Sequence, residues 1–513
     1  MGCCELQQED VETRMRPRAS LSPYPWIHRC SVRYSSKAKA HSAWLLLLIV
    51  LFQYGWSPRT EAADPAVLAP CTIEGLDRRA RCGVFEVAEN PRRPKGRTIG
   101  IHAVVVSAAG PARSDPVVVL MGGPGEDAIS VAREFADMLS ALLADRDLLF
   151  IDQRGTGRSG ALRCNLYSAA DPATSLRDLF PANAVRECAS QLAARADLTQ
   201  YGYTNFAADL EHVRQALGYG PLNLFAGSYG TRAAQVFLRA YPQSVRTVYL
   251  GSVVPLDLAI PLPNARNTEA ALQHTFDACA ADTACQAAFP ELRAEFRQIV
   301  ARLDAGNVRV AVPGSSQPAA LGRGRVIEWL RSRLYRPTTA AEIPWLIHRA
   351  YLDDWMPIAN DILAGARAAD SALSLGLLFS ITCSEDLAFV RERDIQRESA
   401  GTALGDYRIR QQLEACRHWP KVAVPASYRK PLQSAVPAMF VSGDFDAATP
   451  LWFTQRVAPG FFNRHEVIHT GRGHTEWSEC TRQLYQQFVA AGGVRGVEKS
   501  VCEAGPAPSF KVD

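Results

Sequence analysis

Two stretches decide the fold, VVLMGGPG at residues 118–125 and LFAGSYGT at residues 224–231. Each is a short apolar run that leads into a glycine-rich turn and then into a helical pattern. This is how an α/β sheet presents reactive groups at the carboxyl ends of its strands. The second stretch holds a candidate nucleophile, Ser228. The first offers backbone N–H groups for the oxyanion that an attack by Ser228 would create.

Strands and helices alternate on both sides of these stretches. An antiparallel hairpin is expected within residues 83–106, ahead of the main sheet. The alternation predicts an α/β fold, with a mostly parallel, doubly wound sheet that closes on a C-terminal helix. Apolar runs of strand length occupy residues 116–120, 147–152, 223–225, 245–254, 438–442 and 465–468, and helical patterns occupy residues 128–143, 205–217, 229–240 and 478–490.

Residues 256–437 have a different pattern, in which helical segments dominate. Helices are expected at residues 269–288, 291–303, 326–334 and 342–351. We interpret this region as a helical cap inserted into the fold and covering the carboxyl edge of the sheet. The predicted organisation is an export segment over residues 1–62, the first part of the core over 63–255, the cap over 256–437 and the rest of the core over 438–513.

The first 62 residues have the features of an export signal. AWLLLLIVLF at residues 43–52 is shorter than the roughly 20 residues that span a bilayer, but it matches the apolar core of a secretory signal. Small residues near Ala62 and Ala63 offer a cleavage point. We therefore expect a secreted or periplasmic protein with no stable membrane span after signal removal, and an uncleaved membrane anchor is the alternative.

The charge distribution does not favour a nucleic-acid partner. The formal net charge of the 513 residues is +4, and the first 62 residues hold eight Lys and Arg against five Asp and Glu. The remainder is therefore close to neutral. It has no basic stripe with interleaved aromatic residues, so we expect no binding to nucleic acid.

Ten of the thirteen cysteines lie after the export segment. An even number of cysteines in an exported chain predicts disulfides. The absence of CxxC or clustered Cys/His spacing argues against a metal site. The spacing favours bridges between sequence neighbours, although other pairings stay open: Cys71 with Cys82, Cys164 with Cys188, Cys279 with Cys285, Cys383 with Cys416, and Cys480 with Cys502.

Residues 155–160 read GTGRSG, which matches the GxGxxG pattern of dinucleotide-binding loops. In such sites a helix opens at the loop, whereas no helical pattern follows here. We therefore expect a structural loop, with no nicotinamide or other cofactor. Asp152 and Arg154 are expected to hold it through local charge-assisted contacts.

AGSYG at residues 226–230 has the form of a nucleophile elbow. The strained turn requires small residues two positions before and after the serine, and Ala226 meets this need where glycine is usual. The N–H of Tyr229, together with that of Gly122 or Gly123, is expected to form the oxyanion hole.

Asp446 follows a later strand and His474 follows the last predicted strand. The order Ser, Asp, His is that of α/β hydrolases. His474 would take the proton of Ser228, and Asp446 would orient the imidazole and stabilise its charged form. Asp444, which is closer to the strand end, is the alternative acid.

Several motifs together resemble the prolyl iminopeptidase and tripeptidyl aminopeptidase family of α/β-hydrolase serine peptidases. The resemblance covers roughly residues 70–505, and the cysteine-bearing carboxyl segment is closer to the tripeptidyl branch. The departures are Ala226 and Met121, where prolyl iminopeptidases usually carry His. The motifs are GGPG at 122–125, DQRGTGRS at 152–159, GSYGT at 227–231, GDFDAATP at 443–450 and GRGH at 471–474.

The resemblance implies cleavage from a free amino terminus, so a group that binds an ammonium is needed. Glu385 and Asp386 lie in the predicted cap, and we expect Glu385, together with Asp386, to receive the substrate's α-amino group. Surface or helix-capping acids are the alternative interpretation. The expected function is an exported serine exopeptidase that forms an acyl-enzyme and acts on peptides. The alternatives are an esterase or amidase that acts on small non-peptide substrates, and a catalytically silent binding module.

Overall fold

The computed structural model describes residues 68–167, 172–313, 315–503, 505 and 508–513. These described residues form one compact unit. The predicted export signal lies outside the described residues. Among the described residues, no single helix is long and apolar enough to cross a membrane. The segments Met356–Ala372 and Leu375–Phe389, which meet at a sharp bend, reach that length and apolarity only when they are taken together.

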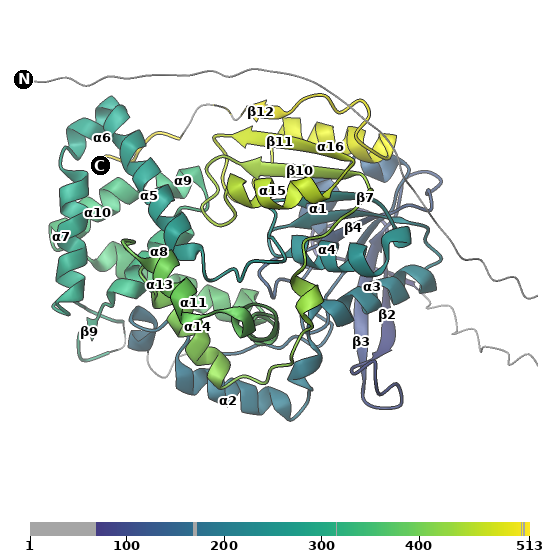
Figure 1. Cartoon of the computed structure of the whole chain (residues 1–513), viewed down its shortest axis with the longest axis horizontal. Coiled ribbons are helices and arrows are strands. Elements are labelled where there is room, and N and C mark those ends of the chain that lie inside the picture. Colours follow the sequence, from purple (N-terminus) through teal and green to yellow (C-terminus); the bar gives the residue numbers. More distant parts are fainter. Residues whose placement is uncertain (1–67, 168–171, 314, 504, 506–507) are drawn as a thin grey trace, which may run out of the picture. The chain divides into compact units, whose positions relative to one another are not determined.

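A ten-stranded sheet forms the core, in the order β1-β2-β3-β5-β4-β6-β7-β10-β11-β12 (Figure 1). The strands from β5 to β12 are parallel, while β1, β2 and β3 are antiparallel. The prediction of a mostly parallel sheet with a preceding hairpin is confirmed. The bounds are β1 Ala69–Cys71, β2 Ala80–Ala88, β3 Thr98–Val106, β4 Val117–Leu120, β5 Leu148–Ile151, β6 Leu222–Gly227, β7 Val245–Gly251, β10 Ala438–Gly443, β11 Arg464–Thr470 and β12 Val501–Glu503.

Helices cover both faces of this sheet. Successive residues of β4 point to opposite faces, so Val117 and Val119 share a core with α1 and α16, while Val118 and Leu120 share a core with α3 and α4. A strand that is buried on both faces must be apolar throughout, which is why VVVL has no polar position. The helices of this part are α1 Ala132–Met138, α2 Ala182–Ala193, α3 Tyr203–Ala216, α4 Gly230–Ala240, α15 Leu451–Val457 and α16 Glu479–Ala491.

The region between β7 and β10 is helical, as predicted. Most of its helices build a second hydrophobic core, which includes Phe276, Ile299 and Ile327. The last part behaves differently, because α12 and Cys383 pack into the core of the sheet. The helices are α5 Asn264–Ala281, α6 Thr283–Ala288, α7 Leu292–Asp304, α8 Arg323–Arg333, α9 Pro337–Ala340, α10 Ile343–Tyr351, α11 Met356–Ala372, α12 Leu375–Ile381, α13 Glu392–Ser399 and α14 Tyr407–Arg417.

Three details correct the sequence interpretation. The helix expected at residues 269–288 is divided at Asp282, whose side chain caps α6 by accepting from the N–H of Cys285 at 2.8 Å. A short hairpin, β8 Arg309–Val310 with β9 Ala319–Ala320, lies within the helical region. The strand β12 follows β11 at the sheet edge, and three residues are too few to give a periodic signal.

Five disulfides join sequence neighbours, with the pairing that the spacing favours. Their Cα–Cα distances lie between 5.2 and 5.8 Å, within the range that disulfide geometry requires. The pairs are Cys71–Cys82, Cys164–Cys188, Cys279–Cys285, Cys383–Cys416 and Cys480–Cys502.

Candidate active site

Ser228 occupies a sharp turn between β6 and α4. Its φ of 52° lies in the left-handed region that non-glycine residues rarely adopt. A Cβ at Gly230 would lie 2.2 Å from the carbonyl oxygen of Leu120, so only glycine allows α4 to start this close to β4. Ala226, two positions before the serine, is fully buried in the sheet and tolerates its methyl group.

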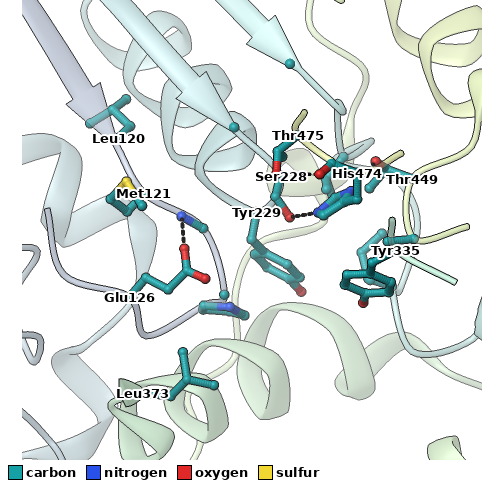
Figure 2. A pocket seen from close by; sticks show the side chains of 18 of the residues that line it. Leu120, Met121, Glu126, Ser228, Tyr229, Tyr335, Leu373, Thr449, His474 and Thr475 are labelled. Carbon is teal, nitrogen blue, oxygen red and sulfur yellow. Dashed lines mark hydrogen bonds between the residues drawn. The ribbon is translucent and has the colours of Figure 1, made fainter. Parts of the chain in front are cut away.

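The structure brings Ser228, Asp446 and His474 together beyond the carboxyl ends of β6, β10 and β11, which lie in the parallel part of the sheet with β7 between β6 and β10. The Ser228 Oγ lies 2.8 Å from His474 Nε2, and a dashed line marks this contact in Figure 2. On the other side of the ring, His474 Nδ1 lies 2.9 Å from Asp446 Oδ2. This is the geometry in which an imidazole can take a proton from a serine while a carboxylate holds its tautomer.

Asp446 is buried among hydrogen-bond donors. Its carboxylate accepts from the hydroxyls of Ser252 at 2.8 Å and Thr449 at 2.7 Å, and from the N–H groups of Ala448 and Thr449. Burial opposes ionisation of the carboxyl, but His474 and these donors outweigh it and hold the pKa of Asp446 at about 2. The group is therefore a stable anion beside the imidazole.

Asp444, the alternative acid, faces elsewhere. It is exposed and accepts from the N–H of Gly471 at 2.7 Å, so it holds the turn after β11. The geometry separates the two aspartates that the sequence left in competition.

Two further contacts to the triad come from Ser252 and Tyr335, which the sequence analysis did not identify. The hydroxyl of Ser252 also accepts from the N–H of Thr475, the residue after His474, at 3.0 Å. The carbonyl of Tyr335 accepts from the N–H of His474 at 2.7 Å, and the two rings lie with centroids 5.0 Å apart. Neither residue belongs to a local sequence motif. Ser252 follows β7 and Tyr335 lies in the helical region, so both approach His474 only when the chain has folded.

The glycine turn after β4 lies directly against the nucleophile. A Cβ at Gly122 would lie 3.1 Å from the Cβ of Ser228. The N–H of Gly122 donates to Glu126 Oε2 at 3.2 Å, a bond that Figure 2 also shows. In the described part of the chain the N–H groups of Gly123 and Tyr229 donate to no other group, so these two are the donors free for an oxyanion.

A cavity of about 700 Å³ opens above Ser228 and His474. One part of its wall carries acidic side chains, Glu126, Asp127 and Glu134, from the segment after the glycine turn. Another part carries basic side chains, Arg331, Arg336 and Arg408, from the helical region. Glu126 is open to the cavity, yet the surrounding walls desolvate its carboxyl group and raise its pKa.

Glu385 and Asp386 do not line this cavity, which corrects the expectation that they receive a substrate ammonium. Glu385, only 3% exposed, accepts from the N–H of Tyr203 at 3.0 Å and from the hydroxyl of Tyr428. Its burial raises its pKa to about 7.

Asp386 is fully buried and paired with Arg232 of α4 at 2.6 Å. It also accepts from the hydroxyl of Tyr229. The sequence offered no sign of these partners, because Arg232 and Asp386 are 154 residues apart. The carboxylate binds the protein itself, next to the residue that follows the nucleophile.

The GTGRSG loop is structural, but its contacts are not all local. Asp152 accepts from the N–H groups of Ala128, Ile129 and Arg158. Arg154 instead forms a bidentate pair with Asp209 of α3, at 2.6 and 2.7 Å, which corrects the expectation of a local contact. In the described part of the chain, no group of three or more His, Cys, Asp or Glu is placed to hold a metal ion.

Comparison with known proteins matches two families along the chain. Residues 115–324 match the α/β hydrolase fold family, and residues 401–502 match the TAP-like protein family. The chain is 25% identical over 438 residues to serine protease Hip1 of Mycobacterium tuberculosis, which covers 77% of this chain and 80% of that protein.

Shorter alignments reach two aminopeptidases. The chain is 26% identical over 200 residues to tripeptidyl aminopeptidase of Streptomyces lividans, covering 35% of this chain and 36% of that protein. It is also 26% identical over 155 residues to proline iminopeptidase of Neisseria gonorrhoeae, covering 30% and 37%. The two matched regions place the chain among the α/β hydrolases, and its sequence is similar to that of serine peptidases, including a prolyl iminopeptidase and a tripeptidyl aminopeptidase.

Proposed function

We propose that this protein is an exported serine aminopeptidase, which releases amino acids or short peptides from free N-termini. The observation that carries the proposal is the chain of contacts from Asp446 through His474 to Ser228 at the floor of the cavity. Similarity to named serine peptidases supports amide bonds as the target, and the likeness to two named aminopeptidases supports the amino-terminal end.

The proposed reaction uses the groups in the order of a serine peptidase. Ser228 Oγ attacks the scissile carbonyl while His474 Nε2 takes its proton, and the oxyanion forms between the N–H groups of Gly123 and Tyr229. The imidazolium then gives the proton to the leaving amine. Water repeats these steps on the acyl-enzyme and releases the amino-terminal fragment.

Glu126 is the proposed receptor for the substrate's ammonium group. Its carboxylate lines the cavity beside Gly122, where a positive charge on the acyl part of a substrate would meet it. A cation in this position would offset the desolvation of the carboxylate.

Export is supported by the five disulfides, because such bonds persist mainly in oxidising compartments. The apolar run at residues 43–52 supplies the proposed signal.

A panel of chromogenic substrates tests the function. It contains amino-acyl, prolyl and tripeptidyl amides with free amino termini, their acetylated counterparts and simple esters, with Ser228→Ala as the control enzyme. We expect turnover of the free-amine amides and a loss of about 10⁶-fold in the control. Turnover of esters alone would favour the esterase alternative, and no turnover with Ser228 inert to a fluorophosphonate would favour a binding module.

A further inference from the structure

The cavity wall that comes from the helical region carries a surplus of positive charge. Arg331 on α8 and Arg408 on α14 both line the cavity. Their guanidinium groups bind the same atom, Glu328 Oε1, at 2.7 and 2.6 Å. Two cations therefore share one carboxylate.

This cluster is largely withdrawn from water. The side chains of Arg331 and Arg408 are 11% and 17% exposed, and that of Glu328 is 4% exposed. Arg325, also buried, is a further cation on α8 and donates to the carbonyl of Ser175. Buried charges are costly unless they are paired, so the wall has a net charge that an anion in the cavity would neutralise.

The position of the cluster indicates which part of a substrate it meets. Arg331 donates to the hydroxyl of Tyr335, and the ring of Tyr335 lies against His474. Figure 2 shows Tyr335 on the His474 side of Ser228, with Glu126 on the other side. His474 would protonate the leaving amine, so the leaving fragment departs toward the arginines.

We propose that Arg331, Arg408 and the exposed Arg336 form a carboxylate-binding subsite for the leaving fragment of the substrate. This inference rests on the proposed aminopeptidase function and names its substrate class: short peptides that present a carboxylate just beyond the scissile bond. The planar fork of a guanidinium matches both oxygens of a carboxylate. The carboxylate is either the free C-terminus of a short peptide or an acidic side chain.

Matched peptides separate these two sources. One pair shares a sequence and a free amino terminus and differs only in a C-terminal acid or amide. A second pair consists of C-terminal amides with Glu or Gln in the leaving fragment. We expect kcat/KM to be about tenfold higher for the charged member of at least one pair, since a charge-assisted hydrogen bond supplies an effect of that size. The pair that shows the preference identifies the source.

Variants of the arginines test the assignment. Arg408→Gln and Arg336→Gln should reduce the preference for the charged peptide toward unity, mainly through KM. The matched control is Arg410→Gln, because Arg410 lies on the same helix as Arg408 but pairs with Glu392 and Asp406 at the surface. This variant should keep the preference for the charged peptide. Thermal unfolding of each variant shows whether it is folded, and Arg336, which is exposed, provides a readout if Arg408→Gln does not fold.

Equal kcat/KM for charged and neutral members of both pairs in the wild-type enzyme would overturn the subsite while leaving the aminopeptidase function intact. So would a preference that survives in folded Arg408→Gln and Arg336→Gln. Failure to cleave any peptide with a free amino terminus would overturn the proposed function, and this inference with it.

Discussion

Asp444 and Asp446 are two residues apart, yet their carboxylates face different neighbours. Only Asp446 contacts His474, so Asp446→Asn should lower kcat by about 10⁴-fold, because an amide cannot hold the required tautomer. Asp444→Asn is the matched control, since its carboxylate contacts the turn at Gly471. Steady-state kinetics on a tripeptidyl amide measures both. A larger loss from Asp444→Asn would contradict the assignment.

Glu126 gives a second prediction for a single residue. If its carboxylate receives the substrate ammonium, Glu126→Gln should raise KM about tenfold for free-amine amides and leave simple esters without an amine much less affected. Because burial raises the pKa of Glu126, the KM of the wild type should also rise as the pH falls through the pKa of this group, and the variant should lack that rise. An equal loss on both substrate types would instead indicate that Glu126 positions the Gly122 turn.

At the scale of single residues, the sequence predicted Ser228, Asp446 and His474, which the structure brings into contact, because each follows a predicted strand. It could not identify Ser252 or Tyr335, whose contacts with the histidine segment exist only after β7 and the helical region fold together. It also placed Glu385 and Asp386 at the substrate, whereas the structure buries both away from the cavity, for a related reason. A pair of acidic residues in sequence carries no information about a buried arginine such as Arg232.

At the scale of elements, the π-helical turn Thr382–Asp386 is tied to the helix that follows the nucleophile. Asp386→Asn would leave the fully buried Arg232 without its anionic partner, so we expect a loss of about 3–5 kcal/mol in the free energy of unfolding. The same substitution should also lower kcat, because the hydroxyl of Tyr229, the residue after the nucleophile, loses its charged acceptor.

The control for this prediction is Asp406→Asn. Asp406 pairs with Arg410 at the surface, where both side chains are more than 40% exposed, and such pairs contribute at most about 1 kcal/mol. Urea unfolding with the disulfides intact compares the two variants. Equal stability of Asp386→Asn and the wild type would show that the buried pair does not hold these elements together.

The accuracy of the element predictions follows the strength of the hydrophobic pattern. The strand β4 is apolar throughout, and β6 is apolar apart from Asn223, because helices cover both faces of the sheet. The positions of both strands were therefore predictable. The strand β12 was not, because it has only three residues and lies at the sheet edge, where Cys502 is bonded to Cys480 of α16. The break between α5 and α6 was missed because it depends on the cap formed by Asp282.

At the scale of the whole molecule, Glu385 makes stability depend on pH. Its pKa is raised from 4.5 to about 7, first by burial and then by the charge of Asp386, against opposing hydrogen bonds. The folded state therefore holds this proton more tightly than the unfolded chain. The resulting contribution to the free energy of unfolding is complete below about pH 4.5 and is lost as the pH rises through about 7.

We expect Glu385→Gln to remove this loss of stability with rising pH. Relative to the variant, the wild type should lose a few kcal/mol in the free energy of unfolding over that range, since one unit of pKa corresponds to about 1.4 kcal/mol. Glu392→Gln, a change at an exposed residue, serves as the control. Parallel pH profiles for the wild type and Glu385→Gln would contradict the prediction.

In the proposed reaction, Ser228 carries the amino-terminal fragment of a peptide as an acyl-enzyme. Acid quenching during turnover of a free-amine peptide, followed by mass spectrometry of the digested protein, tests it directly. We expect the proteolytic fragment that contains Ser228 to gain the mass of the substrate's amino-terminal residues, and we expect no such gain in Ser228→Ala. An adduct on another residue, or one that carries the carboxyl-terminal part of the substrate, would contradict it.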